Sequence, residues 1–295
     1  MENVLLIVNP SSGGEKAKEY EASAKEKLAS LFDKVEVKRT EKAGDAEDFA
    51  AKAAQEQYHS VFTMGGDGTV NEAVNGLAGQ ENRPNFGFFP LGTVNDLARA
   101  LNMPLDPKKA ISSLDITKQR HLDIGKINDR YFTNVVAIGA IPERINQVDT
   151  EEKTKFGKMA YFISGAKQLS ANQSYQFKLT IDGDEQEIES STLLIGLTNS
   201  IGGFESLIPN ATIDDGKLHL LYLKDQNFLD TVKTVPDLLR GVKESTKNVA
   251  YQTAENLIVE VLNQAKLATN VDGDPGAALP VKIQVLPAHL TVYTG

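Results

Sequence analysis

The chain has 295 residues, of which 41% are hydrophobic and 24% charged, and its formal net charge is −9. This composition is typical of a globular protein and excludes an extended disordered chain. The negative charge argues against a nucleic-acid partner, because nucleic acids select basic surfaces. The absence of cysteine excludes disulfides, cysteine-ligated zinc and thiol nucleophiles. The length predicts two domains.

The sequence carries no signal for export or membrane insertion. No apolar run approaches the ~18 to 20 residues that cross a bilayer, and the start, MENVLLIVNPSSGG, lacks a basic region and a small-residue cleavage site. We therefore expect a cytoplasmic protein. The histidines are scattered without an H-x-x-x-H pair, so a histidine-based metal site is not expected.

Residues 1–115 alternate short apolar runs with amphipathic stretches. We predict strands at 4–8, 35–39, 60–64 and 86–90, and helices at 15–32, 45–57, 69–77, 95–101 and 107–114. Strands that alternate with helices favour a parallel sheet covered on both faces. The sequence therefore predicts an α/β domain over residues 1–120.

Beyond residue 120 the chain is rich in short apolar segments separated by turn residues. Strands are predicted at 122–127, 130–138, 175–183, 191–199, 217–223, 256–262 and 281–287. This pattern favours a mostly antiparallel β-sandwich over residues 121–285, interrupted by helices at 153–169 and 228–242. The C-terminal tail, at about 286–295, can return to the first domain and pack against it. Close packing of the two domains would form a cleft.

The segment SVFTMGGDGTVNEAVNGL at 60–77 reads as a strand, a glycine-rich turn and a helix. In an α/β sheet such a turn lies at the carboxyl end of a strand, where ligands bind. The glycines allow close approach of a ligand, and the amides of the following helix face an anion, with Thr69 as the expected cap. Asp67 would repel phosphate unless a cation bridges them, which indicates Mg-ATP. The alternative is an ordinary capped turn, and neither standard nucleotide fingerprint is present.

Further motifs surround GGDGTVNEAVNGL in a fixed order. They are NP at 9–10 with Gly13 and Gly14, PLGTVNDLARAL at 90–101, LDIGKIN at 122–128, PNATIDDGKLHL at 209–220 and VDGDPG at 271–276. Together they resemble the bacterial diacylglycerol kinase family, whose catalytic domain is shared with sphingosine and ceramide kinases and, more distantly, with NAD kinase. The resemblance covers essentially the whole chain. It implies an α/β nucleotide-binding domain of the NAD kinase type followed by a β-sandwich-like domain.

The resemblance also implies where ATP binds. The residues expected to contact the nucleotide are Asn9, Thr40, Gly65, Gly66, Asp67, Gly68, Thr69, Val70, Asn71, Glu72, Thr93 and Asn95. Thr40 and Thr93 each follow a predicted strand, where a hydroxyl can reach a phosphate or ribose. An ordinary helix cap is the alternative role for both, and for Asn95 and Asp96.

The resemblance implies a structural Mg²⁺ site as well. Its ligands would be Asp215 and the main-chain carbonyls of Thr212 and Lys217, with Asp123 as a further acid. Without the resemblance, the segment DDGK at 214–217 indicates a hairpin turn.

Four aspartates are expected at the catalytic centre, namely Asp67, Asp96, Asp272 and Asp274. The family's usual motif is D-G-E, whose glutamate accepts the proton of the substrate hydroxyl, whereas this chain reads Asp272-Gly273-Asp274. The shorter side chain withdraws the carboxylate by ~1.5 Å, and a misplacement of about 1 Å can cost ~100-fold in rate. The segment IDGD at 181–184 has the same local pattern and is expected to be a hairpin tip. Only its position in the order of motifs favours Asp274 as the base.

We therefore expect an ATP- and Mg²⁺-dependent kinase that phosphorylates a lipid hydroxyl, converting diacylglycerol to phosphatidic acid. The alternatives are a soluble-metabolite kinase of the NAD kinase type and a non-catalytic nucleotide or lipid sensor. A lipid substrate requires peripheral contact with a membrane, for which Lys153–Leu169 mixes lysines with aromatic residues. A helix packed on the sandwich is the alternative there. The sequence leaves both a monomer and a homodimer open.

Overall fold

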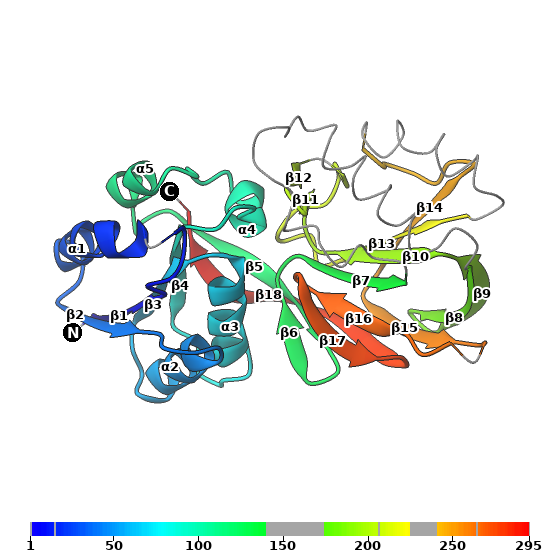
Figure 1. The fold of residues 1–295 in the computed structure, drawn as a ribbon, viewed down its shortest axis with the longest axis horizontal. Helices are drawn as coiled ribbons and strands as arrows, with labels where there is room; N and C mark the ends of the chain where they lie inside the picture. Colours follow the sequence, from blue (N-terminus) through cyan, green and yellow to red (C-terminus); the bar gives the residue numbers. More distant parts are fainter. Residues whose placement is uncertain are drawn as a thin grey trace.

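The computed structural model describes residues 2–14, 16–139, 174–205, 207–224, 241–263 and 265–294. These residues form two lobes (Figure 1). One lobe packs helices around a sheet, and the described part of the other consists of strands. Strands β5 (Gln119–Ile127) and β18 (Val281–Tyr293) run between the lobes and pair with each other.

The N-terminal domain alternates strands with helices, as predicted. Its elements are β1 (Asn3–Val8), α1 (Lys16–Ala29), β2 (Lys34–Arg39), α2 (Asp45–Gln55), β3 (Ser60–Gly65), α3 (Asp67–Ala78), β4 (Asn85–Pro90), α4 (Asp96–Ala100) and α5 (Pro107–Ser113). Strands β2, β1, β3 and β4 are neighbours in that order, and each pair is parallel. The carboxyl ends of these strands therefore meet at one edge of the sheet.

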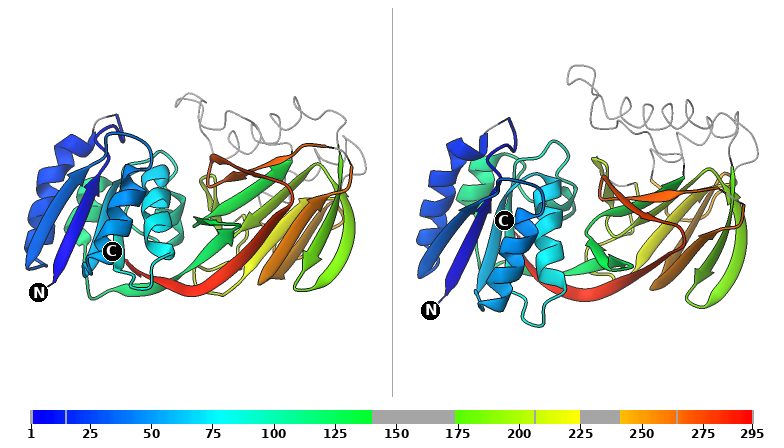
Figure 2. Two further views of the ribbon diagram at one scale, coloured as in Figure 1. Left: turned by 90° about the horizontal axis from the view of Figure 1, so that it is seen from below. Right: turned by 60° about the horizontal axis from the view of Figure 1, so that its bottom comes forward.

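Helices cover both faces of this sheet (Figure 2). Along β1, Leu5 and Ile7 pack into a core with residues of α2, α3 and α4. Leu6 and Val8 point to the other face and pack with residues of α1 and α5. Burial on both faces explains why these strands are continuous apolar runs rather than alternating ones.

The C-terminal domain is a sandwich of antiparallel strands, which confirms the predicted fold class. Its strands are β6 (Arg130–Phe132), β7 (Val135–Gly139), β8 (Tyr175–Ile181), β9 (Asp184–Ser190), β10 (Thr192–Gly196), β11 (Ser200–Ile201), β12 (Phe204–Glu205), β13 (Leu218–Leu223), β14 (Val249–Ala254), β15 (Asn256–Val261), β16 (Ala268–Val271) and β17 (Asp274–Ala278). One sheet has the order β14-β13-β10-β7-β16-β17, and β18-β15-β8-β9 continues the sheet of the first domain. Their facing side chains, among them Phe177, Ile283, Ile138 and Leu220, form the core between them.

The last strand links the two domains. Strand β18 pairs with β15 in the sandwich, then with β5, and finally places Val292 beside Phe86 of β4. Tyr293 is 1% exposed, packs in the core under α1 and α5, and hydrogen-bonds through its hydroxyl to Ser60 at 2.7 Å. The end of the described chain therefore belongs to the core of the N-terminal domain (Figure 2).

Two differences from the sequence-based expectation affect the site. The strand predicted at 130–138 is split into β6 and β7, because the amides of Thr133 and Asn134 turn toward Asp272. The helices predicted at 153–169 and 228–242 lie outside the described residues, apart from 241 and 242. Among the helices that the structure does describe, none is long and apolar enough to cross a bilayer.

Candidate functional site

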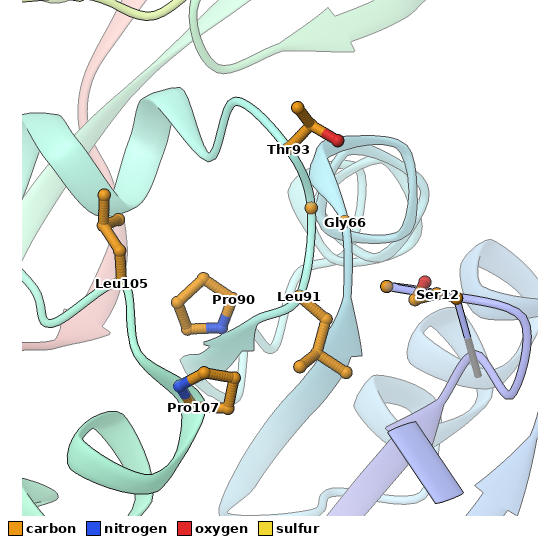
Figure 3. A pocket seen from close by; sticks show the side chains of 10 residues that line it. Ser12, Gly66, Pro90, Leu91, Thr93, Leu105 and Pro107 are labelled. Atoms are coloured by element: carbon orange, nitrogen blue, oxygen red, sulfur yellow. The ribbon is translucent and has the colours of Figure 1, made fainter. Parts of the chain in front are cut away.

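A cavity of about 440 Å³ lies where β1, β3 and β4 end. Its lining consists of Ser12, Gly13, Gly14, Gly66, Pro90, Leu91, Gly92, Thr93, Leu105 and Pro107. Figure 3 shows Ser12 and Leu105 at opposite sides, with Leu91 between them. Prolines and leucines form one part of the wall, and glycine backbone with two hydroxyl groups forms another. Such a wall suits a ligand that is apolar at one end and anionic at the other.

Glycine is required in this wall because the backbone itself comes close. A Cβ on Gly92 would lie 2.7 Å from Oδ1 of Asn95 and 3.0 Å from Cα of Gly66. Gly13 and Gly14 have φ angles of 63° and 69°, which side chains other than glycine rarely adopt. Exposed amides at a helix N-terminus and in glycine turns are the usual protein cradle for phosphate.

The structure corrects the expected cap of α3. This helix begins at Asp67, with Gly66 as its N-cap and no side-chain cap, so Thr69 lies inside the first turn. Oγ1 of Thr69 instead accepts a hydrogen bond from Nδ2 of Asn9 at 3.1 Å. Oδ1 of Asn9 accepts from the amide of Ser11. Asn9 and Thr69 therefore fix the glycine turn at 11–14 against the start of α3.

Asp67 joins the two glycine-containing segments of the cavity. Its carboxylate accepts the amides of Asn95 at 2.9 Å and Asp96 at 3.0 Å, at the start of α4. Asn95 is the N-cap residue of α4 but bonds to Gly92 instead of capping the helix with its side chain. Burial raises the pKa of Asp67, and the two amides oppose the rise. Asp67 therefore caps a helix other than its own.

Asp96 reaches the C-terminal domain. Its Oδ1 accepts from Oγ of Ser200 at 2.6 Å and from the amide of Gly203 at 2.8 Å, and its Oδ2 accepts from the amide of Gly202 at 2.7 Å. Asp96 is 7% exposed. Asp96, the first residue of α4 and an expected catalytic residue, thus lies at the domain interface.

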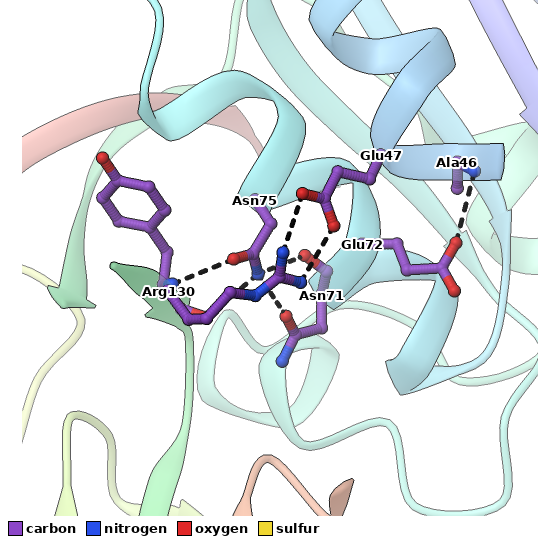
Figure 4. Close-up of polar contacts among 7 residues, drawn as sticks. Ala46, Glu47, Asn71, Glu72, Asn75 and Arg130 are labelled. Atoms are coloured by element: carbon purple, nitrogen blue, oxygen red, sulfur yellow. Dashed lines mark hydrogen bonds and ion pairs between the residues drawn. The ribbon is translucent and has the colours of Figure 1, made fainter. Parts of the chain in front are cut away.

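Three further residues of the glycine-rich motif make structural contacts. Val70 packs in the hydrophobic core, and Oε2 of Glu72 accepts the amide of Ala46 at the start of α2. Asn71 donates to Oδ2 of Asp272 at 2.9 Å. Figure 4 shows how Asn71 and Glu72 point away from each other on α3. Neither these three residues nor Thr40 belongs to the cavity lining.

The outer turns of α3 also dock on the second domain. Asn75 donates to the carbonyl of Tyr131 and accepts the amide of the same residue, both at 2.9 Å. Arg130 forms a paired hydrogen bond with the carboxylate of Glu47 on α2, with both distances 2.8 Å (Figure 4). Planar two-point pairing of this kind fixes orientation as well as distance. The β5–β6 hairpin is therefore attached to both helices.

Asp272 is the most heavily hydrogen-bonded carboxylate of the expected site. Oδ1 accepts the amides of Asn134 and Val135, and Oδ2 accepts the amide and hydroxyl of Thr133 as well as the side chain of Asn71. Burial raises the pKa of Asp272 to about 6, while these donors oppose the rise. A carboxylate surrounded by donors on both oxygens is suited to holding the domains together.

Asp274 is exposed and begins β17, opposite Val271 of β16. It lies two residues beyond Asp272, whose side chain contacts α3. An exposed carboxylate is free to accept a proton from a substrate that comes within hydrogen-bond distance.

The residues expected to hold a structural metal form an oxygen-rich corner. Asp123 accepts the amides of Gly216 and Ala288, and Asp215 accepts those of Thr212 and Lys217 and bonds to Nε2 of His219. Burial raises the pKa of Asp123, and the charges of Asp215 and Asp214 add to the rise. Burial opposes ionisation of Asp215, but its donors, His219 foremost, hold its pKa below the usual value.

This corner fits a hard cation, because each carboxylate oxygen can accept more than one bond and the two acids repel each other. The described residues hold no group of three or more acidic or histidine side chains suited to a metal. A cation here would therefore rely on Asp123, Asp215 and main-chain carbonyls.

Several cavity residues were not predicted as ligand contacts. Gly13 and Gly14 belong to a sequence motif without a predicted ligand contact, although two glycines after an apolar strand are a usable signal for a phosphate turn. Pro90, Leu105 and Pro107 carry no such signal, because an apolar wall residue looks like a core residue in sequence. Outside the cavity, Ser200 was not predicted as a site residue, because it is distant in sequence from Asp96, which it contacts.

The fold and site define a two-domain protein with a glycine-lined cavity at the carboxyl ends of parallel strands in its α/β domain. Residues 3–127 match the family model of the diacylglycerol kinase catalytic domain, and residues 134–294 match that of the YegS C-terminal NAD kinase beta sandwich-like domain. A diacylglycerol kinase of Staphylococcus carnosus is 36% identical, over 98% of this chain and 94% of its own. One from Bacillus subtilis is 35% identical, over 99% and 96%.

A solved structure supports the same assignment. The crystal structure of a diacylglycerol kinase from Bacillus anthracis matches with a TM-score of 0.79 and 26% identity, covering 100% of this chain and 97% of that one. The chain therefore belongs to the diacylglycerol kinase family.

Proposed function

We propose that this protein is an ATP- and Mg²⁺-dependent lipid kinase that phosphorylates the hydroxyl of diacylglycerol to give phosphatidic acid. Family membership supports the general class, a kinase that acts on a lipid. The observation that carries the nucleotide part is the cavity at the carboxyl ends of three parallel strands, lined by Gly13, Gly14, Gly66 and Gly92. A close approach of glycine backbone beside a helix N-terminus is well suited to binding phosphate.

In this proposal, the glycine backbone and the hydroxyl of Thr93 hold the phosphates of ATP. The acceptor oxygen of the lipid bonds to the γ-phosphorus, the bond to the bridging oxygen of ADP breaks, and the hydroxyl proton passes to the carboxylate of Asp274. Mg²⁺ supplies neutralisation of the phosphate charge. Asp67 is the candidate ligand for this ion, because both of its oxygens retain lone pairs beyond the amides that they accept.

A second Mg²⁺ belongs to the proposal, held by Asp215, Asp123 and the carbonyls of Thr212 and Lys217. Its role is structural, since Asp123 also accepts the amide of Ala288 from β18. During turnover the protein would contact the membrane that contains its substrate. The stretch expected to make that contact, 153–169, lies outside the described residues.

The substrate is tested by incubating the protein with labelled Mg-ATP and, separately, diacylglycerol, ceramide, sphingosine and NAD. We expect label in phosphatidic acid, and none when the metal is chelated. Label in NAD with none in any lipid would identify a soluble-metabolite kinase. ATP binding without turnover, in both the wild type and Asp274→Glu, would identify a sensor.

The nucleotide site is tested by calorimetry. Thr93→Val removes a hydroxyl from the cavity and should weaken ATP about 2- to 10-fold. Ser11→Ala is the matched control, because Ser11 is exposed and lies beside the cavity without lining it. Asp67→Asn should lower both Mg-ATP affinity and turnover, and unchanged values for both would remove Asp67 from the metal site.

A further inference from the structure

Helix α3 carries one polar stripe, which contacts the start of α4 and the C-terminal domain. Asp67, Asn71 and Asn75 are spaced by four residues, so they lie on one face of the helix. Asn75 contacts Tyr131, Asn71 contacts Asp272, and Asp67 contacts the start of α4. The same helix forms the phosphate side of the cavity through Gly66, its N-cap.

The contact made by Asp67 continues into the other domain. Asp67 holds the amide of Asp96, and the carboxylate of Asp96 is enclosed by Ser200, Gly202 and Gly203 at the tip of the β11–β12 hairpin. Gly202 and Gly203 have φ angles of 60° and 79°, which allow both amides to point at one carboxylate. Ser200 is fully buried.

These contacts close into a ring. Leu197 lies three residues before Ser200 in the chain, and its amide donates to the carbonyl of Asn134 at 2.9 Å. The amide of Asn134 in turn donates to Asp272, which accepts from Asn71. Besides the contact of Asn75 with Tyr131, the C-terminal domain therefore holds α3 at Asn71, through Asp272, and one turn earlier at Asp67, indirectly through Ser200 and Asp96.

We propose that the β11–β12 tip is a latch and that Ser200 is a positioning residue for phosphoryl transfer. Ser200 holds Asp96, and through it the start of α4 and the backbone of Gly92, in the geometry that the reacting phosphate needs. This inference rests on the proposed kinase function. The described cavity lining comes from residues 12–107 only, whereas the latch belongs to the second domain. ATP therefore still binds when the latch is lost, but the reacting phosphate is no longer held in the geometry that transfer needs.

The test compares Ser200→Ala with Ser190→Ala. Ser190 is also a fully buried serine of the sandwich, and its hydroxyl bonds only within its own turn, to Thr192, among the contacts that the structure describes. We expect Ser200→Ala to lower kcat ~10- to 100-fold with the KM for ATP unchanged within about twofold. Equal losses of thermal stability in both variants with unchanged kcat would show a merely structural role and overturn the proposal.

A second readout does not depend on the lipid. Hydrogen exchange at amides 66–68 and 92–96 should be about 10-fold faster in Ser200→Ala than in Ser190→Ala. If the wild type phosphorylates no lipid, the proposed function fails, while this exchange still decides the latch. Unchanged exchange overturns the latch whatever the substrate.

Two further variants complete the design. In an Asp96→Ala background, Ser200→Ala should change kcat less than about twofold, because Ser200 acts through the carboxylate of Asp96. A decrease in kcat as large as that of Ser200→Ala alone would show that Ser200 does not act through Asp96. If Ser200→Ala does not fold, Gly203→Ala replaces it, since it keeps the hydroxyl and strains only the amide donor at φ 79°. The same outcomes are then expected.

Discussion

The hairpin tips at 182–184 and 272–274 have the same three residues, Asp-Gly-Asp, and almost the same backbone. Their aspartates have φ angles of 50° and 49°, and their glycines 97° and 99°. In both, the first carboxylate accepts two consecutive amides of a neighbouring segment, at 255–256 for Asp182 and at 134–135 for Asp272. This shared interaction of the first aspartate fixes each turn to the neighbouring strand of its sheet.

Among the contacts of the described residues, the tip at 272–274 reaches the α/β domain and the tip at 182–184 does not. Asp272 uses its other oxygen for Thr133 and for Asn71, on the helix that follows the glycine-rich turn. The contacts of Asp182 with Glu255 and Asn256 remain at the surface of the sandwich. An Asp-Gly-Asp tip is therefore a structural element of this fold, and its location beside α3 gives one copy a second role.

The largest expected effect is on stability. Asp272→Ala leaves buried amides without an acceptor and should lower the free energy of unfolding by about 3 kcal/mol or more. Asp182→Ala should cost about 1 kcal/mol, since water can replace an exposed acceptor. Urea unfolding of both variants measures the difference. Equal losses of unfolding free energy would show that the contacts of Asp272 at the domain interface add no stability beyond those shared with Asp182.

Loss of the contact between Asp272 and α3 should have a smaller effect. Asn71→Ala removes a hydrogen bond to a carboxylate and should cost about 1.5 to 2 kcal/mol in unfolding free energy. The double variant with Asp182→Ala should be additive, because those sites share no partner. The double variant with Asp272→Ala should be less than additive. Additivity there would contradict a direct contact.

The pH dependence of stability follows from the raised pKa of Asp272, which is about 6 in the folded protein against an ordinary value of 3.8. The folded protein binds this proton more tightly, so the stabilisation is complete below pH 3.8 and is lost as the pH rises through about 6. Lowering the pH from 7 to 5 should stabilise the wild type by about 1.4 kcal/mol relative to Asp272→Asn. Asp182→Asn is the control for the other titrating groups, and a constant difference between wild type and Asp272→Asn would contradict the raised pKa.

The smallest expected effect concerns the last residue of each tip. Asp274→Glu extends the carboxylate by one methylene and should raise kcat on diacylglycerol by ~5-fold, if the native aspartate falls short of the hydroxyl. Asp184→Glu, at the equivalent place in the other tip, should leave kcat unchanged. A loss of activity in Asp274→Glu would show that the backbone already compensates for the shorter side chain.

Much of the fold was readable from the sequence, because local patterns carry it. The apolar runs at 4–8 and 60–64 are buried on both faces, and the structure has β1 and β3 there within a residue at either end. The edge strand β9 was not predicted, because its sequence DEQEIES shows little apolar alternation. The position of the glycine-rich turn was predicted correctly. The prediction of Thr69 as the helix cap was wrong, because α3 begins at Asp67, and that start depends on tertiary contacts.

The sequence by itself determined the alternation of strands and helices, the glycine turns and the order of the motifs, because these depend on residues close together in the chain. The tertiary structure decided what the polar residues of those motifs do. Asp67, Asp96 and Asn71 each bond to a partner at least 28 residues away, at Asn95, Ser200 and Asp272. Such pairings arise from the docking of two domains, and no local pattern records which donor will meet which carboxylate.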